Sequence, residues 1–259
     1  MTSLPGERLP DESIPYESSN YEPNTRIRWG LPDAGVLLTL NLVAIYGLEF
    51  LVATFPSWRD SIGFFGSLFF YAVTFALLFF VSRSRGLGSL ARDFGLQFKR
   101  IDVAIGLAIG LGLTLLLAVI ANVMRNAHAL PPVVPTDRNL IWVIFSQGLL
   151  AVIVVPVAEE LTNRGLVMRA VRNHIVRRHA TVHGQGAALY VSIVASALVF
   201  AALHLHEAQD LPSGIALGMR TFIFGILAGW IATKTGRLGP SIIAHGTLNA
   251  ISFFAALAA

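Results

Sequence analysis

The sequence contains no cysteine, which excludes disulfides, iron–sulfur clusters and thiol nucleophiles. Charged residues are also scarce. They make up 13% of the 259 residues, whereas a soluble domain usually carries about 25%. Hydrophobic residues account for 54% of the chain, and its mean hydropathy is +0.66. This apolar surplus indicates a protein whose surface faces lipid.

The net charge of +4 does not indicate a nucleic-acid-binding protein. The basic residues lie between apolar stretches, which is typical of the cytoplasmic loops of membrane proteins. We therefore expect the lipid bilayer, and no nucleic acid, as a partner. Residues 1–30 are polar and rich in Pro, Glu and Ser, so we expect no cleavable signal peptide there. We expect a disordered tail at 1–30 and a transmembrane helical domain at 31–259.

The apolar residues fall into stretches of about 20, the length that crosses a bilayer as a helix. These predict an all-α, polytopic bundle of about seven transmembrane helices, with eight as the upper count. The stretches are 34–55, 62–81, 103–124, 141–168, 187–204, 214–233 and 238–258. Lys and Arg gather before the first stretch and in alternate loops, which predicts a cytoplasmic N-terminus. Glycines four residues apart, such as Gly106 and Gly110, predict close helix packing.

Ionisable residues inside membrane helices are costly and mark functional sites. The fourth stretch holds Glu159, Glu160 and Arg164. Glu160 and Arg164 are four residues apart, so they can pair along one helix face. Glu159 points about 100° away and is left to face a cavity. A charge-neutralised packing network is the alternative interpretation.

Two later stretches carry polar side chains on one helix face each. Phe200 and His204 are one turn apart, and an imidazole can accept, donate or relay a proton near neutral pH. His245 and Asn249 are likewise one turn apart and could hold a developing oxyanion. An interhelical hydrogen bond that only packs the helices is the alternative for this second pair. Arg220 is expected to extend towards the membrane surface.

The three motifs, Glu-Glu-x-x-x-Arg, Phe-x-x-x-His and His-x-x-x-Asn, occur in this order, each in a membrane helix. Together they resemble the CPBP family, the CAAX prenyl endopeptidase and bacteriocin-processing (Abi) intramembrane proteases. The resemblance covers about 141–256, the expected catalytic core. One departure is Asn163, because the family usually has a large apolar residue just before the motif arginine.

The resemblance implies a glutamate-dependent endopeptidase. In that family the residue matching Glu159 is the general base that activates water, and the one matching His204 helps to orient it. His245 and Asn249 would stabilise the oxyanion, while Glu160 and Arg164, with Phe200 beside them, would support the site. The implied substrate is a peptide or lipidated protein, such as a prenylated CAAX protein. The expected location is the bacterial plasma membrane.

Other mechanisms remain open at this point. No His-Glu-x-x-His, Gly-x-Ser-x-Gly or Gly-x-Gly-Asp motif occurs, so the usual zinc, serine and aspartyl mechanisms lack their parts. We expect no metal or other cofactor, with a zinc site on Glu159, His204 and His245 as the less favoured alternative. A non-catalytic scaffold, immunity or regulatory protein and a small transporter or proton relay are the other hypotheses. The oligomeric state is not predicted.

Helix geometry sets a condition on all of these hypotheses. At about 1.5 Å per residue from the cytoplasmic side, His245 lies at about 12 Å, Glu159 at about 20 Å and His204 at about 27 Å. Straight, perpendicular helices would keep the three apart. A tilted fifth helix, a late start of that helix, or a kink at Pro156 would bring them level.

Overall fold

The computed structural model describes residues 25–124, 140–178 and 182–257. These residues form helices and no strands, so the all-α prediction is confirmed for the described part of the chain. Most of the expected tail at 1–30 lies outside the described residues. The helices, in chain order, are α1 (Leu31–Thr54), η1 (Pro56–Trp58), α2 (Arg59–Arg85), α3 (Leu90–Phe94), α4 (Ile101–Met124), α5 (Leu140–Val143), η2 (Ile144–Val154), α6 (Val155–Glu160), η3 (Leu161–Val167), α7 (Met168–Arg178), α8 (Val182–His204), η4 (Leu205–Glu207), α9 (Leu211–Thr235) and α10 (Gly239–Leu257).

Every predicted apolar stretch is helical, and six helices within the described ranges are long and apolar enough to cross a membrane. The seventh prediction corresponds to α10, which is a helix of 19 residues but is not among those six. The chain is therefore a multi-pass membrane protein. Its cytoplasmic N-terminus stays a prediction.

The predicted fourth stretch belongs to one continuous helix that runs from α5 through α7 and changes its winding along the way. Its η2 and η3 segments are π-helical, with wider turns than an α-helix. Such segments are rare and frequently occur at functional sites. Glu159 and Glu160 lie between them, at the end of α6.

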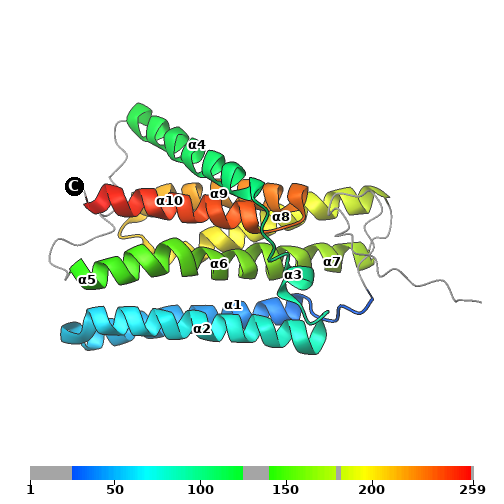
Figure 1. The fold of residues 1–259 in the computed structure, drawn as a ribbon, viewed down its shortest axis with the longest axis horizontal. Coiled ribbons are helices and arrows are strands. Elements are labelled where there is room, and N and C mark those ends of the chain that lie inside the picture. Colours follow the sequence, from blue (N-terminus) through cyan, green and yellow to red (C-terminus); the bar gives the residue numbers. More distant parts are fainter. Residues whose placement is uncertain (1–24, 125–139, 179–181, 258–259) are drawn as a thin grey trace, which may run out of the picture.

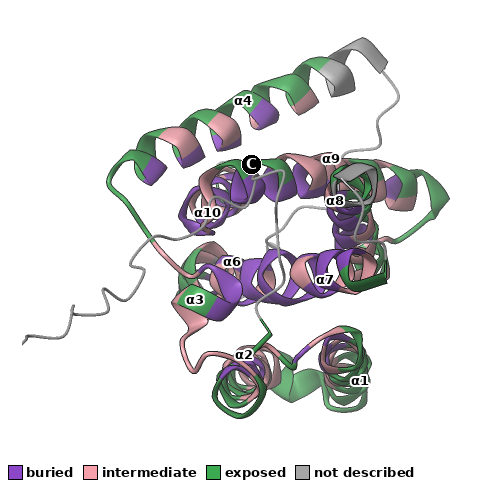
Figure 2. Cartoon of the chain, turned by 90° about the vertical axis from the view of Figure 1, so that its right-hand side faces the viewer, coloured by how far each residue is buried: buried purple, intermediate pink, exposed green. Residues whose placement is uncertain are grey.

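The helices form a bundle in which this long helix is central (Figure 1). α1 and α2 pack as a pair on one side of it, and α8, α9 and α10 pack on the other sides. Viewed along the helices, buried residues concentrate on α6 to α10, whereas α1, α2 and α4 are mostly exposed (Figure 2). That exposed apolar surface is suited to lipid, because a membrane protein buries its polar groups inside.

One end of the bundle, here called the basic end, carries the loops that are rich in Lys and Arg. It holds the start of α1, the end of α2, the end of α7 and the starts of α8 and α10, at the right of Figure 1. The short helix α3 closes this end. Its Phe94 is fully buried against Gly165, and its Asp93 accepts hydrogen bonds from Trp29 and Ser82.

Glycines let α4 approach α10 closely, as the four-residue spacing predicted. A Cβ atom on Gly106 would lie 2.9 Å from the Pro240 carbonyl oxygen, and one on Gly110 would lie 3.0 Å from the Ala244 carbonyl oxygen. Gly112, on the same helix, faces open space. The close contact between α4 and α10 therefore requires that Gly106 and Gly110 have no side chain.

We expect Gly110→Ala to destabilise the protein by about 1–3 kcal/mol, because the new methyl group would clash with Thr247 and with backbone. The matched control is Gly112→Ala, whose methyl group meets nothing and should stabilise the helix by up to about 1 kcal/mol. Unfolding of both variants in detergent micelles measures the difference. Equal stabilities would contradict the close packing described here.

Candidate active site

The centre of the bundle holds a fully buried ion pair. Arg164 Nη1 donates to Glu160 Oε1 at 2.9 Å, and both side chains have no exposed surface. The predicted pairing of these two residues along one helix face is confirmed. Burying two charges is costly, and the mutual attraction compensates for it only when further partners surround the pair.

Aromatic rings supply part of that surrounding. The Arg164 guanidinium lies over the ring of Phe200 at 4.4 Å and near the ring of Phe224 at 5.4 Å. Phe200 also contacts His204, with ring centroids 4.5 Å apart, and Phe224 contacts His245 at 4.9 Å. Phe224 therefore belongs to the site, although sequence reasoning gave it no role. The only signal was its place, one turn after Arg220 in a glycine-bearing helix.

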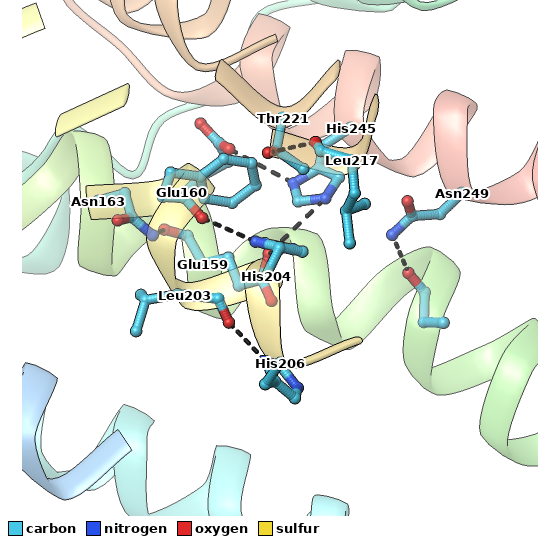
Figure 3. Close-up of polar contacts among 12 residues, drawn as sticks. Glu159, Glu160, Asn163, Leu203, His204, His206, Leu217, Thr221, His245 and Asn249 are labelled. Carbon is cyan, nitrogen blue, oxygen red and sulfur yellow. Dashed lines mark hydrogen bonds and ion pairs between the residues drawn. The ribbon is translucent and has the colours of Figure 1, made fainter. Parts of the chain in front are cut away.

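Glu159 points away from this pair and faces two imidazoles (Figure 3). Its Oε2 lies 3.8 Å from His204 Nε2 and 3.7 Å from His245 Nε2. Three polar side chains from three separate helices thus converge, as the resemblance required. Glu159 and His204 keep some exposed surface, whereas His245 is buried.

The partner of Nδ1 indicates which ring nitrogen of each imidazole carries a proton. His204 Nδ1 lies 2.8 Å from the Phe200 carbonyl oxygen, which can only accept, so Nδ1 carries a proton. His245 Nδ1 lies 3.4 Å from Glu160 Oε1, and this carboxylate favours a proton there too. In the neutral form of each ring, Nε2 is then an acceptor directed at Glu159.

Glu159, His204 and His245 lie at the same depth because α7 and α8 extend beyond the neighbouring helices. In Figure 1 the end of α7 and the start of α8 reach further at the basic end than α2, α3 or α10. α8 begins at Val182, so its last residue, His204, lies at the level of Glu159. Of the three alternatives considered for bringing the residues level, a late start of this helix is not the one observed, because α8 begins early, at Val182.

Asn249 lines the same cavity as His245 but contacts a different partner. Its Nδ2 donates to the Ala151 carbonyl oxygen at 2.7 Å, away from Glu159 (Figure 3). Ala151 is free to accept because of Pro156. In η2 each carbonyl bonds the N–H five residues on, as Leu150 does with Val155, and proline has no N–H. Asn249 thus forms an interhelical hydrogen bond, which is the alternative role given for this residue in the sequence analysis. Its amide has one further N–H that this bond does not use.

Asn163, the departure from the family pattern, is buried and connects two helices. Its Nδ2 donates to the Glu159 carbonyl oxygen at 2.9 Å, where α6 passes into η3. The main-chain carbonyl oxygen of Asn163 accepts from the Ser196 hydroxyl of α8 at 2.9 Å. An amide at this position therefore fixes the backbone that carries Glu159, a task that a large apolar side chain would have to meet by packing.

Two cavities meet at Glu159 and His204. The first, of about 220 Å³, lies between α1 and α2 on one side and α8 on the other. Glu49 lines it, and its Oε1 lies 3.8 Å from His206 Nε2. The second, of about 480 Å³, lies between η2, α9 and α10 and is lined by His245, Asn249 and Arg220.

Arg220 differs from expectation, because its side chain faces this second cavity and donates to Ser252 at 3.1 Å. No group of three or more His, Asp or Glu side chains in the described ranges is arranged to hold a metal ion.

The fold and the site together describe a polytopic helical membrane protein. Its site contains a carboxylate that faces two imidazoles beside a buried ion pair. Residues 141–251 match the family described as type II CAAX prenyl endopeptidase Rce1-like. This match confirms the resemblance based on the three motifs, and the similarity to this family covers residues 141–251. No curated protein and no solved structure matches the chain.

We expect Arg164→Met to destabilise the protein by about 3–5 kcal/mol, because it leaves the Glu160 carboxylate buried without its counter-charge. Replacing both residues, as Glu160→Gln with Arg164→Met, should cost less than this single change. Arg100→Met is the matched control at an exposed position, where the effect should stay within about 0.5 kcal/mol. Unfolding in detergent measures all three variants. A double variant less stable than Arg164→Met would contradict the ion-pair argument.

Proposed function

We propose that the protein is an intramembrane endopeptidase in which Glu159 activates a water molecule for attack on a peptide bond. The observation that carries the proposal is the convergence of the Glu159 carboxylate with His204 and His245 at the junction of two cavities. The family match supports peptide hydrolysis as the reaction class.

The electrostatics of the site favour a water molecule at this junction. Glu159 Oε2 is buried and has no hydrogen-bond donor among the described residues. With its proton on Nδ1, the neutral His204 ring presents Nε2 to Glu159 as a second acceptor, so the two groups would repel one another. A water molecule offers two protons to such a group, and polar contacts beyond 3.5 Å are typically bridged by water. Glu159 would take one of these protons as the hydroxyl oxygen attacks the carbonyl carbon.

The resulting oxyanion needs hydrogen-bond donors on the side of the carbonyl that faces away from Glu159. His245 would take part as the imidazolium from the start of the reaction, so that Nε2 donates to the oxyanion while Nδ1 faces the Glu160 carboxylate. Asn249 would contribute its remaining N–H from the same cavity. Such preorganised donors are usually the largest single contribution to acyl-transfer catalysis. Glu159 would then return its proton to the leaving amine.

We further propose that the substrate is a membrane-associated peptide, which includes prenylated proteins of the CAAX type, and that the protein works in a bacterial plasma membrane. The basic end beneath the site is filled by packed residues such as Trp29, Phe94 and Leu238. Both cavities extend from Glu159 away from that end, so the substrate would enter from the other end or laterally from the bilayer.

We expect Glu159→Gln to lower kcat for peptide cleavage by about 10²–10⁴-fold while the protein remains folded, because the amide keeps the size but cannot accept the proton. A cleavage assay on the purified protein with a quenched peptide library measures kcat. Asp33→Asn is the control, since this carboxylate pairs with Arg85 at the basic end. Full activity of Glu159→Gln would end the proposal and favour a scaffold or regulatory role.

We expect cleavage to continue in the presence of metal chelators, because the proposed mechanism uses only side chains and water. The measurement is the cleavage rate before and after incubation with 1,10-phenanthroline, followed by addition of Zn²⁺. Loss of activity that zinc restores would support the alternative in which Glu159, His204 and His245 hold a zinc ion.

A further inference from the structure

Tyr71 of α2 lies where the two cavities meet, although it belongs neither to the three motifs nor to the matched segment. Both cavities are lined by Tyr71, Glu159, Phe200, His204 and Glu207. Tyr71 is partly buried, and its helix packs against α6 and η2, next to the glutamate. Within the described ranges, it is the one residue that the α1–α2 pair contributes to this junction.

The Tyr71 hydroxyl can donate a proton but forms no hydrogen bond with another described residue. The Glu159 and Glu207 carboxylates lie near enough to act on it electrostatically. The other side chains at the junction offer no comparable donor. The two carboxylates accept, Phe200 has no polar atom, and the Nδ1 proton of His204 is used on the Phe200 carbonyl oxygen.

The first cavity has the size and the polar wall that water requires. Thr162 and Asn163 are buried and line this cavity. Their Oγ1 and Oδ1 atoms have no hydrogen-bond partner in the described part of the chain. Buried polar atoms of this kind are normally satisfied by water, and one molecule of liquid water occupies about 30 Å³. A cavity of about 220 Å³ therefore has room for several water molecules beside Glu159.

We infer that the Tyr71 hydroxyl holds the hydrolytic water at the junction, as the hydrogen-bond donor to the water oxygen. The inference rests on the proposed function and adds one residue to it. Glu159 Oε2 and His204 Nε2 both accept and lie 3.8 Å apart, so one water molecule can donate a hydrogen to each. Its oxygen then has two lone pairs. One accepts from Tyr71, and the other faces the peptide carbonyl in the second cavity.

The hydroxyl orients the water and transfers no proton in the reaction. As the water oxygen bonds to the carbonyl carbon, its O–H bond on the side of Glu159 breaks and the carboxylate takes that proton. Glu159 later gives the same proton to the leaving amine, and the O–H bond of Tyr71 stays intact. Holding the nucleophile in one orientation lowers the barrier of the chemical step and leaves peptide binding unchanged.

The test is Tyr71→Phe, which removes one oxygen atom and keeps the ring. We expect kcat for peptide cleavage to fall about 10–100-fold, the size of the loss of one strong hydrogen bond. The KM should stay within about twofold, because the interaction is not made with the peptide. Thermal unfolding in detergent should be unchanged. Tyr46→Phe is the matched control, since it removes the same atom from an exposed position on α1 and should keep the wild-type kcat.

A second variant tests whether donation itself is required. Replacing Tyr71 with p-aminophenylalanine puts an N–H donor at the same place on the ring. We expect this variant to recover part of the kcat that Tyr71→Phe loses. A kcat as low as that of Tyr71→Phe would show that donation at this position is not what the reaction needs, and would overturn the inference.

The outcomes separate the role of Tyr71 from the proposed function. A wild-type kcat in Tyr71→Phe, beside an inactive Glu159→Gln, overturns the role of Tyr71 alone. A raised KM at an unchanged kcat also overturns it, because the hydroxyl would then bind the peptide and not the water. Full activity of Glu159→Gln, or no cleavage of any peptide by the wild type, overturns both proposals.

Discussion

The site depends on the buried pair of Glu160 and Arg164, because this pair determines where every neighbouring group lies. Glu160 is held by Arg164 on one side of the helix, so the adjacent Glu159 points about 100° away from it, into the cavities. Arg164 in turn lies against Phe200 and Phe224, and these rings contact the two imidazoles. One ion pair thus orients a carboxylate on its own helix and two histidines on others. Either charge without the other would be costly to bury inside the bundle.

Much of this arrangement was predictable from the sequence because it follows from helix periodicity. The apolar stretches have the length of a bilayer span, and a four-residue spacing places Glu160 beside Arg164 whatever the rest of the chain does. The same periodicity places Phe200 beside His204. The convergence of three helices was predictable only through the family resemblance, since no property of one helix states how far it extends beyond another.

The remaining features could not be predicted because each depends on contacts between helices or on a change of helix winding. Arg220 resembles a residue that extends to the membrane surface, and only the position of α10 shows that it donates to Ser252. Asn163 breaks the family pattern, yet its amide meets the Glu159 carbonyl because α6 passes into a π-helical segment there. The Phe224 side chain has no polar atom, so a search for polar and ionisable residues does not identify its contact with Arg164.

Pro156 shows how a missing atom can define the register between two helices. Its absent N–H leaves the Ala151 carbonyl without a partner in its own helix, and Asn249 of α10 binds that carbonyl instead. His245 lies one turn before Asn249, so this hydrogen bond joins the helix that carries Glu159 to α10 close to the imidazole. Pro156 and Asn249 are therefore linked, because the amide of one helix binds the carbonyl that the proline of another leaves open.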